Sequence, residues 1–307
     1  MNKLERVADG IDPGLSVRLR ALKMRLRHDV FLRLLQGMVG PADVGVDVGA
    51  NRGVYAYLMS VRVGRRGHVH AVEPFPENGA RLRTIARRRG NITVHAVAAS
   101  DRPGAGVLQI PVHDGHRIDA LASLEPDQAL NQDSCTVPLC PLDELLDGER
   151  RISIVKCDVE GHEQRVFEGA ARILDHDRPI VFTEVEQRHR RDPIENTFTF
   201  FGAAGYRGWF VAGSGLRPLE EFDVARDQLA FLDGRFMPYV MPDGYVYDFL
   251  FCPPGILPPP SALADLRVRR VTGGPEDQDE TGHRTACRRA AHSWNSCHRL
   301  HFGQHHN

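Results

Sequence analysis

Acidic side chains stand at the ends of three apolar stretches of this sequence, where buried strands would end. Asp47 lies in VGVDVGANRG, Glu73 follows HVHAV, and Asp158 follows ISIVKC. In parallel α/β sheets, ligands bind in the crevice at the carboxyl ends of the strands. We therefore expect the three carboxylates to lie around one ligand site.

The turn after Asp47 indicates a nucleoside ligand without a pyrophosphate. A Walker phosphate loop requires a lysine after its last glycine, but Gly53 is followed by Val54. A dinucleotide fold requires G-x-G-x-x-G, and from Gly49 the second and third glycine positions hold Asn51 and Val54. Because the middle glycine lets the backbone approach a pyrophosphate, its absence predicts a ligand that has none.

S-adenosylmethionine fits this pattern. An acid at the tip of the second strand, here Glu73, can accept hydrogen bonds from both ribose hydroxyls. The carboxylate of the ligand can lie by the amides of the turn and the helix start, and its ammonium near Asp47. The alternative, that both acids only cap helices, leaves the glycine turn between them unexplained. The predicted cofactor turn comprises Asp47, Gly49, Ala50, Asn51 and Gly53.

A second group of ionisable residues follows the stretch ISIVKC. Lys156, Asp158 and Glu160 alternate, so an extended segment would turn them to one side. We expect Lys156 to pair with an acid. Beside S-adenosylmethionine such groups could align a methyl acceptor, and an acceptor that loses a proton also requires a base. The candidates are Asp158, Glu160, His162 and Glu184.

Among these candidates we favour Asp158, which would lie beside the methyl sulfonium, or Glu160. His162 is either an alternative base or a helix-start residue that faces solvent. Oxygen ligands at Asp158, Glu160 and Glu184 suit magnesium, but their spacing does not require a metal, and none is predicted. Ser123 lies in a loop that could close over the methionine end.

Strand and helix patterns alternate from residue 44 onward, which predicts a parallel sheet covered by helices. The predicted strands are 44–48, 67–72, 92–98, 152–157 and 180–183, and the predicted helices start near Arg52, Pro76, Glu163 and Pro193. Two further strands, in 205–212 and 245–252, are expected to form an antiparallel pair at the sheet edge.

The N-terminal segment 14–38 has helical spacing. Its predicted apolar stripe is Leu15, Leu19, Leu22, Leu26 and Val30. Its arginines form either a basic face for RNA or lipid headgroups, or a solvated face of a helix packed on the domain. We favour the solvated face.

Composition excludes few classes of protein. The 307 residues are 42% hydrophobic and 26% charged, and the net charge of −1 offers no general attraction to nucleic acid or anionic membranes. The N-terminus lacks a secretory h-region, and no apolar run is long enough to span a bilayer. Six scattered cysteines without a C-x-x-C pair predict reduced thiols and a cytoplasmic location.

Taken in order, several blocks resemble the FkbM-type family of class I S-adenosylmethionine-dependent methyltransferases. The most family-like piece is KCDVEGHE followed by VFEGA, and the other blocks are VDVGANRGVYAYL, HAVEPFPENGARL, NITVHAVAASDRPG, IDALASL, VPLCPLDELL and RPIVFTEVE. The resemblance covers about residues 41–255 and implies a doubly wound, mostly parallel, Rossmann-like sheet of seven strands with an antiparallel last strand.

The resemblance also implies an activity and further site residues. The expected activity is methyl transfer from S-adenosylmethionine to a hydroxyl of a sugar, polyketide or other secondary metabolite. Ala98 and Ser100 fall where the family approaches the adenine, and Glu73 matches its ribose-binding acid. Asp158, Glu160 and Gly161 match its D-x-E-G block, which His162 continues.

The predicted organisation is a helical extension at 1–40, a methyltransferase domain at 41–255, and a Pro-rich linker with a disordered tail at 256–307. The main alternative function is an RNA methyltransferase that uses the N-terminal basic helix and the arginines of RLRTIARRR. A nicotinamide oxidoreductase is disfavoured by the failed glycine pattern, and an inactive binding module by the intact acids. The expected partner is a small hydroxylated acceptor rather than nucleic acid, and a homodimer is left open.

Overall fold

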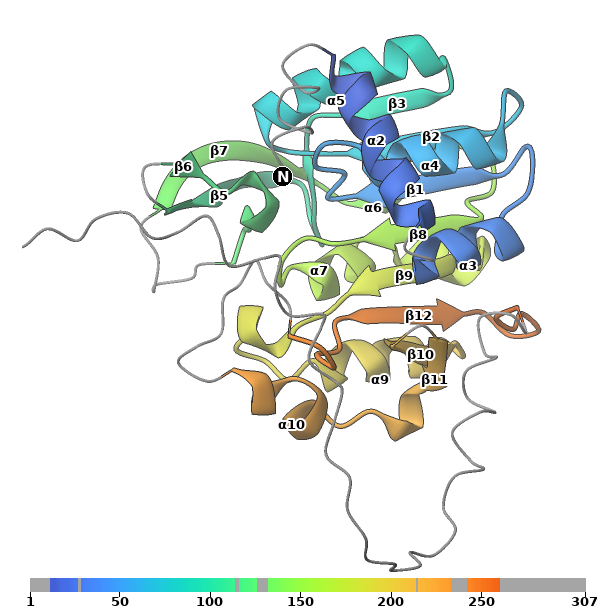
Figure 1. Cartoon of the computed structure of the whole chain (residues 1–307), viewed down its shortest axis with the longest axis vertical. Helices are drawn as coiled ribbons and strands as arrows, with labels where there is room; N and C mark the ends of the chain where they lie inside the picture. Colours follow the sequence, from blue (N-terminus) through green and yellow to red (C-terminus); the bar gives the residue numbers. More distant parts are fainter. Residues whose placement is uncertain are drawn as a thin grey trace, which may run out of the picture. The chain divides into compact units, whose positions relative to one another are not determined.

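The computed structural model describes residues 12–26, 29–113, 116–125, 132–213, 215–232 and 242–259 (Figure 1). The tail predicted to be disordered therefore lies outside the described residues. Among the described residues, no helix is both long enough and apolar enough to cross a membrane.

An eight-stranded sheet forms the centre of the described chain, in the order β11-β10-β12-β9-β8-β1-β2-β3 (Figure 1). Its parallel strands are β1 Val44–Val48, β2 His68–Val72, β3 Ile92–His95, β8 Ile154–Cys157 and β9 Ile180–Glu184. From β1 the chain proceeds to β2 and β3 on one side and returns to β8 on the other. The strand order thus reverses between β1 and β8, where open α/β sheets bind ligands.

The last strand in the sequence, β12 Asp248–Cys252, is antiparallel to its neighbour β9, which confirms the predicted doubly wound sheet with an antiparallel last strand. It also pairs with β10 Arg207–Ala212, as expected. It does not lie at the edge, because β10 lies outside it and β11 Gly215–Pro218 pairs with the far side of β10. Strand β11 adds one strand to the seven that were predicted.

Helices cover both faces of this sheet through two apolar clusters. On one face pack α2 Pro13–Leu26, α3 Val30–Met38, α4 Val54–Val63 and α5 Pro76–Arg89. On the other face pack α6 Leu142–Leu145, α7 Glu163–Glu168, α8 Ala171–His176 and α9 Glu195–Ala203. The strands are buried on both sides, which explains why they read as nearly continuous apolar runs. Shorter segments are η2 Gln187–His189, η3 Leu219–Glu221, α10 Val224–Asp227 and η4 Leu229–Phe231.

A second, smaller sheet lies beside the main sheet and was not predicted (Figure 1). Its strands are β4 Ala98–Ala99, β5 Gly104–His113, β6 His116–Arg117 and β7 Gln132–Cys140. The strand predicted at 92–98 is in fact divided, because β3 ends at His95 and Ala98 pairs with β7. Phe75, Leu108, Ile110 and Val137 form a separate core for this sheet.

The N-terminal stripe prediction is wrong. Segment 14–38 forms two helices, with the Asp29 carboxylate capping the second by accepting from Leu32 N. Helix α2 buries Val17 and Ala21, whereas Leu22 and Leu26 are 53% and 73% exposed. Helix α2 packs on α4 and α5. Small side chains on the buried face allow such close approach, which turns the leucines outward.

Candidate active site

The turn after β1 is held tightly against the segment that follows β8. Gly49 has φ +71°, and a Cβ at this position would lie 1.8 Å from the carbonyl oxygen of Asp158. Only glycine permits this approach. Asn51 also has a positive φ of 47°, a conformation that asparagine tolerates better than most residues. The glycine turn therefore places Asp158 directly beside the expected cofactor segment.

Glu73, just after β2, is fixed by two backbone amides. Its Oε2 accepts from Asn51 N at 2.7 Å, and its Oε1 accepts from Phe75 N at 2.9 Å. Burial raises the pKa of Glu73 to about 7, and the two amides oppose that rise. Each carboxylate oxygen retains further acceptor capacity, so Glu73 can still receive two hydroxyl donors.

A pocket of about 590 Å³, a volume that includes its opening to solvent, lies at this end of the sheet. Its wall includes seven predicted site residues, namely Gly49, Asn51, Glu73, Ala98, Asp158, Glu160 and His162. The other predicted site residues do not line it, namely Asp47, Ala50, Gly53, Ser100 and Glu184. The structure thus brings the cofactor turn, the Glu73 carboxylate and the D-x-E-G block to one cavity.

One side of the pocket is apolar. It is formed by Ala98 and Ala99 of β4, Leu108 of β5, and Ala122 and Leu124 of the following loop. Of these five residues sequence reasoning identified only Ala98, although the IDALASL block contains both Ala122 and Leu124. This side offers a slot for a flat, weakly polar group.

The loop that contains Ala122 and Leu124 is held by two side-chain hydrogen bonds. Arg52 Nε donates to Asp119 Oδ2 at 3.0 Å. Ser123 Oγ donates to the Glu160 carbonyl at 2.6 Å. Ser123 itself does not line the pocket. Its hydroxyl instead fixes the loop to the D-x-E-G segment.

Asp47 lies beneath the turn, not in the pocket wall. It is fully buried, and within the described part of the chain neither carboxylate oxygen makes a hydrogen bond of good geometry. Burial raises the pKa of Asp47 to about 6, while the charge of Lys156 opposes the rise. A direct contact of Asp47 with a ligand ammonium stays a prediction.

Lys156 pairs with an acid, as the sequence predicted. Its Nζ is 2.8 Å from Asp158 Oδ2 and 4.6 Å from the centre of the Tyr55 ring. Lys156 is 1% exposed, whereas the Asp158 side chain is 24% exposed and reaches the pocket. A buried ammonium therefore orients a carboxylate that remains accessible to a ligand.

His162 is held on both ring nitrogens and does not face solvent. Its Nδ1 donates to Glu125 Oε1 at 2.8 Å, and its Nε2 is 3.0 Å from Ser100 Oγ. The solvent-facing interpretation of His162 is therefore wrong, since the residue is 7% exposed. Ser100 was expected near the adenine, but its hydroxyl contacts this imidazole. The two residues connect the segment after β4 to the D-x-E-G block.

Glu160 and Glu184 have partners that the sequence did not indicate. Glu160 has φ +53°, and its Oε2 lies 2.8 Å from Nε2 of His189. Glu184 ends β9 opposite Asp248 of β12, and burial, followed by the charges of Asp158 and Asp248, raises its pKa. Neither His189 nor Asp248 stands in a motif, so only the three-dimensional arrangement identifies them.

A match to a protein family identifies the class of the chain. Residues 47–208 match the Methyltransferase FkbM domain family. No curated protein matches the sequence significantly.

The similar solved structures are distant. Methyltransferase FkbM from Methylobacillus flagellatus KT shares 17% identity over 78% of this chain and 55% of that chain, with a TM-score of 0.44. Precorrin-6y C5,15-methyltransferase from Geobacter metallireducens GS-15 shares 14% identity over 73% of this chain and 87% of that chain, with a TM-score of 0.40. Aeropyrum pernix fibrillarin with bound S-adenosyl-L-methionine shares 14% identity over 73% of each chain, with a TM-score of 0.38. The chain thus spans about half the length of the FkbM structure.

Proposed function

Because the chain belongs to the Methyltransferase FkbM domain family, we propose that it methylates a hydroxyl oxygen of a small molecule. The methyl donor is S-adenosylmethionine. One observation carries the proposal: Glu73, Asp158 and the glycine turn line the same pocket. Two backbone amides fix the Glu73 carboxylate, and Lys156 fixes that of Asp158.

The pocket has the features that the donor requires. Glu73 retains acceptors for the two ribose hydroxyls. The apolar side formed by Ala98, Leu108 and Leu124 suits the adenine ring. The turn at Gly49 and Asn51 lies at the start of α4, where backbone amides favour the methionine carboxylate. This arrangement directs the sulfonium toward Asp158.

Asp158 is the residue that we assign to the acceptor. Its carboxylate orients the hydroxyl and takes the proton as the oxygen attacks the methyl carbon. The carbon–sulfur bond breaks with its electron pair left on sulfur, so the products are a methyl ether and S-adenosylhomocysteine. Lys156 keeps Asp158 in one orientation throughout, because the ammonium is buried and has little freedom to move.

The other predicted bases fit the role less well. Both nitrogens of His162 are already in contact with side chains, so the imidazole would have to break one contact to accept a proton. Glu184 lies outside the pocket wall. Glu160 lines the pocket, but its carboxylate lies against His189.

An RNA acceptor is less well supported. Two arginines of the basic segment on α5 make contacts within the chain, Arg88 with Asp12 and Arg89 with Ser60. The net charge of −1 provides no general attraction to a phosphate backbone. A cytoplasmic location remains part of the proposal, supported by the free cysteines at 135, 140, 157 and 252.

The test incubates the full chain with methyl-labelled S-adenosylmethionine and a panel of hydroxylated metabolites, with total RNA as a separate arm. Asp158→Asn should lower turnover by about 10²-fold or more, the usual contribution of general base catalysis. Its affinity for S-adenosylhomocysteine, measured by calorimetry, should stay within about threefold of the unmodified protein, because Glu73 and the turn are untouched. Asp147→Asn is the matched control, since that side chain is 85% exposed.

Three results would count against the proposal. Wild-type turnover in Asp158→Asn would show that the base is elsewhere. Label transferred to RNA and to no metabolite would favour the alternative acceptor. Label recovered on nitrogen or carbon would refute the assignment to oxygen.

A further inference from the structure

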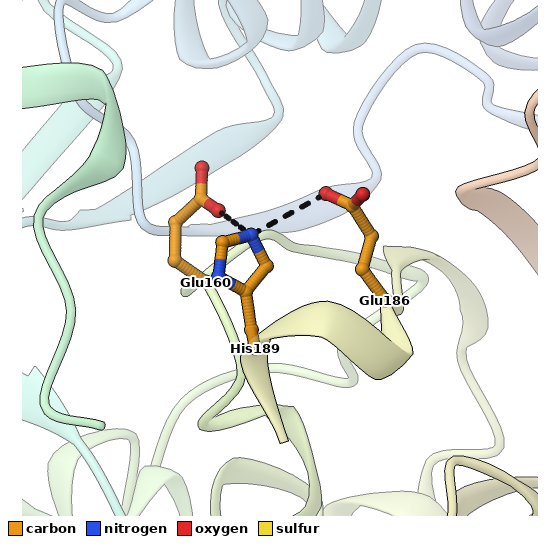
Figure 2. A group of neighbouring side chains, drawn as sticks. All are labelled: Glu160, Glu186 and His189. Carbon is orange, nitrogen blue, oxygen red and sulfur yellow. Dashed lines mark ion pairs between the residues drawn. The ribbon is translucent and has the colours of Figure 1, made fainter. Parts of the chain in front are cut away.

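Three side chains from different segments of the chain meet near the pocket, and one of them, Glu160, lines it. Glu160 lies in the turn after β8, Glu186 lies shortly after β9, and His189 ends the short helix η2. Figure 2 shows the imidazole of His189 between the two carboxylates, with Nε2 directed at both. Nε2 lies 2.8 Å from Glu160 Oε2 and 3.6 Å from Glu186 Oε1.

Both contacts of the His189 imidazole lie at ion-pair distance. The Nε2 atom is buried, yet it makes no hydrogen bond of good geometry in the described part of the chain. The 2.8 Å distance between Nε2 and Glu160 Oε2 therefore joins two atoms that can both bind a metal, without an N–H bond aligned between them. One ligand atom from each of the three residues lies within 4.8 Å of the other two.

We propose that Glu160, Glu186 and His189 bind a divalent transition-metal ion at the wall of the cofactor pocket. The distances agree with a shared ion. Two ligands at about 2.1 Å from one metal lie about 3.0 Å apart at a right angle and about 3.4 Å apart at the tetrahedral angle. The observed separations of 2.8 and 3.6 Å lie close to these values.

The ligand types select the class of metal. One imidazole nitrogen with two carboxylate oxygens suits manganese, iron(II), cobalt or zinc. Magnesium and calcium prefer oxygen alone. The site differs from the oxygen-only set of Asp158, Glu160 and Glu184 considered from the sequence, and shares only Glu160 with it.

Neighbouring groups hold the three ligands in place. Arg188 donates to both oxygens of Glu186 at 2.7 Å, which fixes that carboxylate as outer-shell partners do at known metal sites. Gly161 has φ +105°, and a Cβ there would lie 2.8 Å from the carbonyl oxygen of His189. The glycine thus permits the close backbone approach that brings Glu160 to the imidazole.

The position of the ion relative to the pocket gives it a role. Glu160 lines the pocket, whereas Glu186 and His189 do not. Three protein ligands leave coordination positions open, as in catalytic metal sites. An oxygen of the acceptor is the ligand that these positions would take, an interpretation that rests on the proposed function.

The experiment measures metal binding directly. The full chain is treated with a chelator, dialysed and titrated with Mn²⁺, while the free ion is followed by electron paramagnetic resonance. We expect one bound equivalent, and a loss of affinity of at least about tenfold in His189→Gln and in Glu186→Gln, as for altered metal-site residues.

Two controls separate this site from other histidines. His70→Gln removes another buried histidine, which contacts Glu149. A double variant, His305→Gln with His306→Gln, removes the last two of the fifteen histidines in the chain. Both should retain the bound equivalent. Circular dichroism of each variant and the visible spectrum of the Co²⁺ form show whether a loss reflects unfolding or a lost ligand.

The outcomes are distinguishable from those of the methylation assay. No bound equivalent, or an equivalent that survives in folded His189→Gln, would overturn the metal site whether or not the protein methylates an acceptor. A bound ion that is lost in the variants supports it even if no acceptor is found. Full turnover in the metal-free protein would refute the role in acceptor binding.

Discussion

Replacing Gly49 by alanine tests the central geometric claim, that the turn after β1 and the Asp158 segment touch. The new Cβ would lie 1.8 Å from the Asp158 carbonyl oxygen, whereas ordinary contact begins at 3.4 Å, a shortfall of 1.6 Å. Gly64→Ala is a matched control, because Gly64 has φ +69°, close to +71° for Gly49, but a Cβ there meets nothing within 4 Å.

The difference between the two variants isolates the clash. Gly64 has φ +69° and ψ −168°, a conformation that is essentially restricted to glycine, so Gly64→Ala should lower the free energy of unfolding by about 1–3 kcal/mol. Gly49→Ala also carries a conformational cost, because Gly49 has a positive φ of +71°, and it must in addition displace a backbone carbonyl. Forced overpacking adds about 1–3 kcal/mol. The expected difference in unfolding free energy between the variants is therefore about 1–3 kcal/mol.

Function should separate the variants more sharply than stability does. The displacement needed at Gly49 moves Asp158, and an error of about 1 Å in a reacting group can cost about 10²-fold in rate. Urea unfolding and calorimetry with S-adenosylhomocysteine are the assays. We expect cofactor affinity to fall at least about tenfold in Gly49→Ala and to be unchanged in Gly64→Ala. Equal affinities in the two variants would refute a cofactor role for the turn.

Two further predictions concern the buried charges. Burial raises the pKa of Glu73 and Glu163 to about 7 and that of Asp248 to about 8. The folded protein thus holds protons that the unfolded chain releases near pH 4, so stability should fall as the pH rises from 6.5 to 8.5. A urea midpoint that rises over this range would contradict the assignment. Lys156→Met removes a buried cation whose charge acts on Asp47 and should cost about 3 kcal/mol in urea unfolding. A loss below about 1 kcal/mol would show that the acids tolerate its absence.

The main sheet was predictable because its strands are buried on both faces. Apolar runs such as VGVDV and ISIVKC can be recognised without knowledge of their neighbours, and the acids after them indicate which edge binds the ligand. The pairing of Lys156 with Asp158 was predictable for a related reason. A charge on such a strand requires a partner, and its nearest acid in the chain lies two residues away.

The smaller sheet and helix α2 were less accessible to sequence reasoning. Strand β7 contains a proline and begins with three polar residues, and its one buried side chain, Val137, packs with Phe75 and Leu108, which are distant in the sequence. In α2 the leucine spacing indicated a buried stripe, but the helix packs through Val17 and Ala21. Periodicity identifies that a helix has a face, whereas the space available against neighbouring helices decides which face is buried.

His162 shows most clearly why residue types alone do not assign roles. A histidine in D-x-E-G-H is a natural candidate for a base, because imidazole titrates near neutrality. Its partners, Ser100 and Glu125, lie 62 and 37 residues away, so no local pattern reveals them. With Nδ1 donating to a carboxylate and Nε2 against a hydroxyl, the imidazole links the segment after β4 to the D-x-E-G turn. For this reason the proposed function assigns the proton to a pocket carboxylate, and we choose Asp158 because a buried lysine fixes its position.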